Sequence, residues 1–378
     1  MTWKIQLSEL NYDHSERNAV NRVVSGEWLT MGGKCGEFET EFSRHHDFDH
    51  PGVFVSSATA GLHLILMALQ ITEGDEVIVP ALTFVSDANV VLQLGATPVF
   101  ADSTSLEDFN LSTDDVIDKI TDKTRAIVIV HFAGFPMDLE RLKKVCEAKG
   151  VWLIEDCAHA PGASIGSKYC GTFGDFGFFS FFSNKNLAVG EGGMVFAKDQ
   201  DKLDMVRSMR SHGMSSVTLD RHLGRSSTYD VQNIGLNYRP DEIRAALGIE
   251  QLKKLKEGNV KRGRLFDRYK ENFTDSLVKV PFANIEADVL PAYHIMPIIL
   301  PKLCDRNMVM DKMKNVGIQT SIHYPSFSSF SAYKKLVSFN GINIAQDICA
   351  RELTLPLHPR LKFGELDIVS NVLLEAVN

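Results

Sequence analysis

The sequence EVIVPALTFVSDANVVLQLGATPVFA, residues 76–101, decides the fold class. Its two ends, 76–79 and 97–101, are short runs typical of β-strands, and a longer segment separates them. Similar runs recur from about residue 50 onward, and stretches with a helical period, such as 60–69 and 138–149, lie between most of them. The other predicted strands are 52–56, 125–131, 151–155, 176–181 and 193–197. This alternation predicts an α/β fold in which helices sandwich a mostly parallel sheet.

The pattern changes near residue 240. Residues 240–260 predict a long amphipathic helix that opens with a proline. The shorter elements predicted after it lie at 292–300, 308–316, 319–323 and 365–377. We therefore predict a large domain, 1–240, and a smaller C-terminal α+β domain, 241–378, joined without a flexible linker.

Composition excludes several classes of protein. The chain has 378 residues, of which 44% are hydrophobic and 23% charged, and its formal charge of −8 gives no basic surface for nucleic acid. Its longest apolar run, 62–69, is far shorter than the ~20 residues that span a membrane, and the first residues do not form a secretion signal. The six cysteines are scattered, without a CxxC pair or a histidine at metal-ligand spacing. These features predict a cytoplasmic protein with reduced thiols and no metal site.

Lys185 lies in SFFSNKNLAVGEGG, residues 180–193, between two apolar strands and just before a glycine-rich turn. Burial there would lower the pKa of the lysine and make its amine a competent nucleophile for Schiff-base chemistry. The alternative is an ordinary surface lysine in a loop.

Asp156 ends the strand VWLIED, and CAHAPGA follows it. At the carboxyl end of a central strand a carboxylate points into the ligand crevice of an α/β sheet. A pyridoxal cofactor needs such an anion to keep its ring nitrogen protonated. Asp156 could equally be a helix N-cap, and His159 could bind the cofactor's phenolate oxygen or be a core histidine.

Three small residues, Ser57, Ala58 and Thr59, stand where a strand turns into a helix. Backbone amides at such a helix N-terminus can bind a phosphate, and Ser180 offers another hydroxyl for it. Phe84, after the strand EVIVP, could stack on a planar cofactor ring. The alternatives are a plain N-cap for the first three residues and a core position for Phe84.

Together these segments resemble one family, the pyridoxal phosphate-dependent sugar aminotransferases called the DegT/DnrJ/EryC1/StrS group, which have the aspartate aminotransferase fold (fold type I). The matching segments, in chain order, are GEWLTMGGKCGEFETEF (26–42), SSATAGLHL (56–64), EVIVPALTFVSDANVVLQLGATPVFAD (76–102), HFAGFPMDLE (131–140), IEDCAHAPGA (154–163), GTFGDFGFFSFFSNKNLAVGEGG (171–193), RSHGM (210–214), IGLNYRPDEIRAALGIEQL (234–252), SIHYPSF (321–327) and LTLPLHP (353–359). Their occurrence in this order is far more specific than any one of them.

The resemblance implies a role for each candidate residue. Lys185 would carry pyridoxal 5'-phosphate and shuttle protons, and Asp156 would pair with the ring nitrogen. His159 would lie near the ring oxygen, and Phe84 would stack on the ring. The phosphate would be held by Ser57, Ala58, Thr59 and Ser180.

The resemblance also implies a homodimer with shared active sites. Asn237, in LNYR, matches an asparagine that reaches the phosphate of the neighbouring subunit in this family. Its place in the chain predicts the far edge of the large domain, where a buried asparagine without partners would be costly.

Two positions bear on how closely this sequence follows the family. The family's phosphate loop usually reads SGTAAL, and here it is SATAGL, so Ala58 replaces a glycine. The change is tolerable if the φ angle there is negative. A branch that dehydrates sugars has histidine at the lysine position, and the presence of Lys185 favours transamination.

The candidate substrate residues are less specific. His323 and Tyr324 match a family segment that approaches the sugar, although they could be packing residues of the small domain. The arginines that could meet a nucleotide diphosphate or a donor carboxylate are Arg210, Arg221, Arg225 and Arg239. For any one of them the alternative, a solvated surface position, is favoured.

We expect an enzyme that transfers an amino group from an amino acid to a nucleotide-linked keto-sugar in amino-sugar biosynthesis. The resemblance implies L-glutamate as the donor. The rival interpretations are a dehydratase or an epimerase with the same cofactor, and a regulator without catalytic activity.

Overall fold

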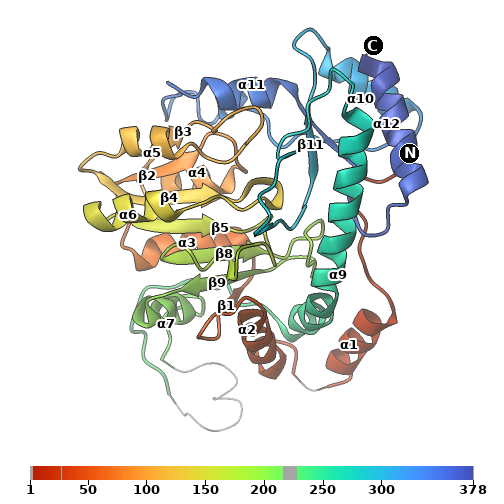
Figure 1. Ribbon diagram of the computed structural model, residues 1–378. Helices are drawn as coiled ribbons and strands as arrows, with labels where there is room; N and C mark the ends of the chain where they lie inside the picture. The colour runs from red at the N-terminus through yellow and green to blue at the C-terminus, as the bar shows by residue number, and fades with distance from the viewer. Residues whose placement is uncertain (1–2, 27, 216–227, 378) are drawn as a thin grey trace.

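The computed structural model describes residues 3–26, 28–215 and 228–377 (Figure 1). In this part of the chain the central sheet has seven strands. In spatial order they are β1 (Val53–Val55), β9 (Gly193–Ala197), β8 (Phe176–Ser180), β5 (Trp152–Asp156), β4 (Thr124–Val130), β2 (Glu76–Pro80) and β3 (Thr97–Ala101). Strand β9 is antiparallel to both of its neighbours, whereas the pairings among β8, β5, β4, β2 and β3 are parallel. The predicted α/β class and the mostly parallel sheet are confirmed.

Helices cover both faces of this sheet because successive strand residues point to opposite sides. On β2, Val77 and Val79 pack in one apolar cluster and Ile78 packs in another. The first face is covered by α3 (Ala58–Ala68), α4 (Ser86–Gln93) and α7 (Gln200–Met209). The second face is covered by α2 (Gly33–His45), α5 (Thr113–Lys119) and α6 (Glu140–Lys149). The strands, buried on both sides, therefore read as continuous apolar runs.

The long helix α9 (Glu242–Phe273) runs alongside the sheet and links it to the C-terminal elements (Figure 1). It packs against α1 (His14–Val24) and α2 near its start and against α12 (Phe363–Val377) farther on. Gly248 permits the close contact with α2, because a Cβ there would lie 2.6 Å from the Phe38 ring. The helix extends well beyond residue 260, where the sequence predicted its end.

The remaining elements form small units around this frame. Strands β11 (Met296–Ile299) and β12 (Glu352–Leu355) pair antiparallel, and α10 (Arg306–Asn315) packs on α12. Helix α11 (Asn343–Arg351) leads into β12. A second small sheet joins β10 (Val289–Leu290), β6 (Ser164–Ile165) and β7 (Lys168–Tyr169). The segment 319–323 forms only an isolated bridge, between Ser321 and Thr354.

The predicted division into domains at residue 240 stays a prediction. Helix α9 begins beside that position, at Glu242. However, the backbone N–H groups of Lys4 and Ile5 donate to the Gly317 carbonyl, so the N-terminal segment joins the C-terminal elements.

Two further findings concern the whole described chain. None of the helices described in the structure is long and apolar enough to cross a membrane. All six cysteines, which lie in the described ranges, are free thiols.

Candidate active site

A cavity of about 670 Å³ opens at the carboxyl edge of the sheet. Ten of the predicted site residues line it: Ser57, Ala58, Thr59, Phe84, Asp156, His159, Ser180, Lys185, His323 and Tyr324. Most of them follow directly from the topology, because the carboxyl ends of parallel strands meet at one edge. The sequence did not identify the rest of the lining: Ser56, Thr83, Ser86, Val130, Ala158, Phe182, Asn184, Glu191 and Arg244.

The N-terminus of α3 supplies one end of the cavity. Ser57 is its N-cap, and the Ser57 hydroxyl accepts the Ala60 N–H at 3.1 Å. The N–H groups of Ala58 and Thr59 lie in the first turn, where a helix lacks internal acceptors and carries a partial positive charge. Ala58 is helical and is not among the residues with positive φ, so the substitution of the family's glycine costs no backbone strain. This end of the cavity fits a phosphate.

Asp156, the last residue of β5, is buried, and its carboxylate accepts the Ala158 N–H at 2.7 Å. Burial raises its pKa to about 6, while the Ala158 N–H and the nearby Lys185 charge oppose that rise. A cation bound against the carboxylate would offset the cost of burying its charge. Asp156 therefore fits a protonated ring nitrogen.

A second buried carboxyl, which the sequence did not reveal, lies behind Asp156. Asp87 on α4 accepts a hydrogen bond from the Thr83 hydroxyl at 2.6 Å. Burial and the nearby Asp156 carboxyl raise the pKa of Asp87 well above its usual value. Two neighbouring buried carboxyls resist ionising together, so Asp87 stays protonated and Asp156 is the one of the pair that can carry a charge.

Lys185 lies in the turn after β8, where its backbone N–H donates to the Phe182 carbonyl at 2.9 Å. Burial lowers the pKa of its side chain to about 8, although the Asp156 charge acts in the opposite direction. The desolvation predicted for this lysine is thus present in the structure. A pKa of about 8 leaves a minor fraction of the side chain, roughly a tenth, as the free amine at pH 7.

His159 and Tyr324 meet across the cavity. The Ala133 N–H donates to His159 Nδ1 at 3.2 Å, so the neutral ring carries its hydrogen on Nε2. That Nε2–H lies 3.0 Å from the Tyr324 hydroxyl. His159 therefore directs its one N–H at the Tyr324 hydroxyl, which also lines the cavity.

Phe84 is not a core residue, because its side chain is 54% exposed. Its ring lies 5.9 Å from that of Tyr324, centroid to centroid, at the wall of the cavity. This placement is compatible with stacking on a flat ligand.

His323 is buried, and its orientation is fixed by β12. Its backbone N–H donates to the Glu352 carboxylate at 2.8 Å, and its Nδ1 lies 2.8 Å from the Thr354 hydroxyl. The Thr354 hydroxyl in turn donates to Glu352, so His323 Nδ1 carries the hydrogen. His323 and Tyr324 thus serve the packing of the C-terminal elements and the lining of the cavity at once.

Several predicted contacts differ in the structure. Asn237, which was predicted to reach the neighbouring subunit, is exposed in the single chain and does not line the cavity of its own chain. Arg239 does not line it either. Arg210 is buried in an ion pair with Glu39 at 2.6 Å, so it stabilises the fold and is not available to a ligand. Arg221 and Arg225 lie outside the described residues.

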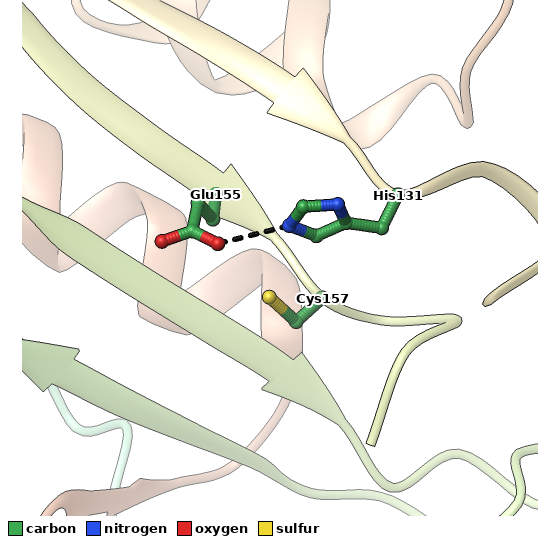
Figure 2. Close-up of side chains that lie close together, drawn as sticks. All are labelled: His131, Glu155 and Cys157. Atoms are coloured by element: carbon green, nitrogen blue, oxygen red, sulfur yellow. Dashed lines mark hydrogen bonds and ion pairs between the residues drawn. The ribbon is translucent and has the colours of Figure 1, made fainter. Parts of the chain in front are cut away.

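A second cluster of buried polar side chains has the composition of a metal site (Figure 2). Ligand atoms of His131, Glu155 and Cys157 lie within 4.8 Å of one another. The Glu155 carboxylate, however, accepts hydrogen bonds from His131 Nε2–H at 2.9 Å and from the Gly171 and Gly174 N–H groups at 2.8 and 2.6 Å. His131 Nδ1 accepts the Met137 N–H at 3.0 Å. Burial raises the pKa of the Cys157 thiol, which keeps it protonated. The cluster is therefore a saturated hydrogen-bond network.

Comparison with known proteins places the chain in a family. Residues 11–374 match the model of the DegT/DnrJ/EryC1/StrS aminotransferase family. GDP-perosamine synthase of Escherichia coli O157:H7 is 34% identical, over 92% of this chain and 91% of that protein. A dTDP-4-dehydro-2,3,6-trideoxy-D-glucose 4-aminotransferase of Saccharopolyspora spinosa is 33% identical, over 96% of this chain and 94% of the relative.

A solved structure gives the same result. Spr1654 of Streptococcus pneumoniae, in its PMP form, is 28% identical and covers 98% of both chains with a TM-score of 0.91. The same protein has also been solved in a PLP form. The fold, the cavity and these matches agree, and the chain belongs to the DegT/DnrJ/EryC1/StrS aminotransferase family of pyridoxal phosphate-dependent enzymes.

Proposed function

We propose that the protein transfers an amino group from an amino acid to the ketone of a nucleotide-linked sugar, with Lys185 as the reacting amine. One observation carries the proposal: a lysine with its pKa lowered to about 8 shares a cavity with a buried aspartate and a helix N-terminus. The two curated relatives, whose names give a GDP-sugar and a dTDP-sugar product or substrate, support the substrate class.

The described residues can hold pyridoxal phosphate as the resemblance implies. The first turn of α3, with Ser57, Ala58 and Thr59, and the Ser180 hydroxyl suit its phosphate. Asp156 suits its ring nitrogen. When bound, the cofactor supplies an electron sink for the charge that develops on the substrate carbon.

Lys185 performs the proton transfers in this proposal. As a free amine it can accept a proton from the α-carbon of the amino donor, and as an ammonium it can return one. A pKa of about 8 allows both forms near neutral pH, which is the condition for efficient general acid–base catalysis.

The mouth of the cavity has groups suited to the substrates. Arg244, on the first turn of α9, is the only arginine that lines the cavity among the described residues. We propose that it binds a carboxylate or phosphate oxygen of a substrate. His323 and Tyr324 are proposed to approach the sugar, and L-glutamate is proposed as the donor.

The proposed assembly is a homodimer in which Asn237 reaches the cofactor phosphate of the partner. The exposure of Asn237 and its absence from its own cavity support this idea. We further propose a cytoplasmic location, which the six free thiols favour.

Borohydride reduction of the cofactor-loaded protein, followed by peptide mapping, tests the role of Lys185. We expect the added mass on the peptide with Lys185, and mass on another lysine would contradict the proposal. Incubation with L-glutamate and a panel of nucleotide-linked keto-sugars should release 2-oxoglutarate together with an aminated sugar. A dehydratase or an epimerase would convert the sugar without releasing the oxo acid.

A further inference from the structure

His294 approaches the reacting lysine from the C-terminal elements. It precedes β11 by two positions, and its buried Nε2 lies 3.5 Å from Lys185 Nζ. No sequence pattern near residue 294 indicated this contact.

Two asparagines fix the hydrogen of the His294 ring. Asn186 Nδ2 donates to the Ala292 carbonyl at 2.7 Å and to Asn259 Oδ1 at 2.9 Å, while Asn259 Nδ2 donates to the Pro161 carbonyl at 3.0 Å. Because carbonyl oxygens only accept, the orientation of both amides is determined. Asn186 Oδ1 is then the group that faces His294 Nδ1, at 2.9 Å. It can only accept, so Nδ1 carries the hydrogen and Nε2 presents a lone pair to Lys185.

The groups around His294 keep its ring neutral. Burial lowers its pKa well below the usual value, and the positive charges of Lys185 and Arg262 add to the effect, as do the neighbouring histidines His159 and His323. The His159 ring lies 4.4 Å from that of His294, centroid to centroid. A neutral ring keeps the lone pair on Nε2 available to an N–H of Lys185.

We propose that His294 is a positioning residue, which accepts one N–H of the Lys185 amine and so aims the rest of that group into the cavity. The inference rests on the proposed function of Lys185 and extends it to a residue of the C-terminal elements. No proton changes place in this contact, since Lys185 keeps its hydrogens. Its effect is to restrict a long, flexible side chain to one productive geometry.

Two variants separate this role from packing. In His294→Gln, the terminal amide lies about where Nε2 was, so an acceptor can still meet Lys185. In His294→Asn, the shorter amide can still donate to Asn186, but no acceptor reaches Lys185. The two variants therefore form a matched pair that differs in the contact under test.

The measurement is the rate of the half-reaction with the amino donor, in the cofactor-loaded protein. We expect His294→Asn to lower kcat by about tenfold to a hundredfold with little change in the donor KM, as for a misplaced reacting group. His294→Gln should recover most of the rate. Equal rates in the two variants would overturn the proposal.

A second readout does not depend on turnover. Long-range ¹H–¹⁵N correlation spectra of the unsubstituted holoenzyme, labelled with ¹⁵N-histidine, should show His294 with hydrogen on Nδ1 and none on Nε2. A hydrogen on Nε2 would overturn the proposal even if the variants fail to fold. Borohydride mapping of the unsubstituted protein tests Lys185 itself, so failure of the proposed function is seen before either variant is measured.

Discussion

Two adjacent carboxyl groups on β5, Glu155 and Asp156, meet different surroundings. Glu155 accepts a hydrogen bond from His131 (Figure 2). It accepts two more from backbone N–H groups. Asp156, on the opposite face of the strand, accepts the Ala158 N–H and borders an open cavity. Both side chains are buried, so burial alone does not distinguish them. A buried carboxylate whose acceptor capacity is filled by the chain supports the fold, whereas one that keeps spare capacity beside a cavity is suited to a ligand.

The same contrast, between a side chain at the cavity and one away from it, applies to two lysines with similar pKa values. It is expected to give the largest effect. Burial lowers the pKa of Lys185 to about 8. Partial desolvation with the nearby Lys143 and Lys168 charges lowers the pKa of the exposed Lys198 to about 8. Lys198 donates to the Phe173 carbonyl at 2.7 Å and does not line the cavity. Lys185→Ala should abolish turnover, and Lys198→Ala should retain it, because only the cavity gives the amine access to substrate. Steady-state assays of both variants check this expectation, and similar losses in the two would refute it.

Asp156→Asn should have the next largest effect on activity. It keeps the shape of the side chain but removes the charge that would pair with the cofactor ring. We expect kcat to fall by about 10²–10³-fold, as when a preorganised electrostatic group is lost. Near-normal turnover of the variant, measured with saturating cofactor, would mean that another group has this role.

The same variant has a pH signature in the cofactor-free protein. The folded pKa of Asp156 is raised from 3.8 to about 6, so the folded state binds this proton more tightly than the unfolded state. The free energy of unfolding should therefore fall as pH rises from 4 to 6, and Asp156→Asn should reduce that slope. Chemical denaturation at several pH values measures it, and an unchanged slope would contradict the assignment.

In the proposed dimer each active site takes residues from both chains, and subunit mixing tests this arrangement. Lys185→Ala and Asn237→Ala proteins, exchanged at equal amounts, should place both defects in one site of each heterodimer and leave its other site intact. Random exchange then restores about a quarter of the normal activity. Heterodimers that are no more active than the parents would exclude a shared site, provided that Asn237→Ala alone is impaired.

The smallest effect on catalysis is expected at Glu155. Glu155→Gln replaces a carboxylate oxygen by an NH₂ group, which faces the N–H donors that Glu155 now accepts. The variant should lower the free energy of unfolding by roughly 2–3 kcal/mol. The protein that folds should keep its kcat. Glu147→Gln is a suitable control, because Glu147 is exposed and pairs with Lys143 at 3.7 Å. A loss of kcat in folded Glu155→Gln would remove the distinction between the two carboxyls.

The sequence predicted those parts of the site that are local in the chain. Asp156 ends a strand, Lys185 and Ser57 follow strands, and topology then brings them to one edge of the sheet. Contacts between distant segments were not predictable in this way. His294 reaches Lys185 from 109 positions away, and Glu39 pairs with Arg210 across 171 positions. The surroundings of Asn237 could not be predicted either, because nothing in LNYR indicates which side of the segment faces solvent.

Helix α9 fixes the distance between two residues that serve the cavity from opposite parts of the helix. Its first turn brings Arg244 to the cavity, and farther along Asn259 holds Asn186 in place. A helix advances about 1.5 Å and turns about 100° per residue. Deleting one residue between Arg244 and Asn259 would therefore shift and rotate one side chain relative to the other. The helix could then no longer make both contacts. Homologues that keep both contacts should tolerate many substitutions in this interval but neither insertions nor deletions.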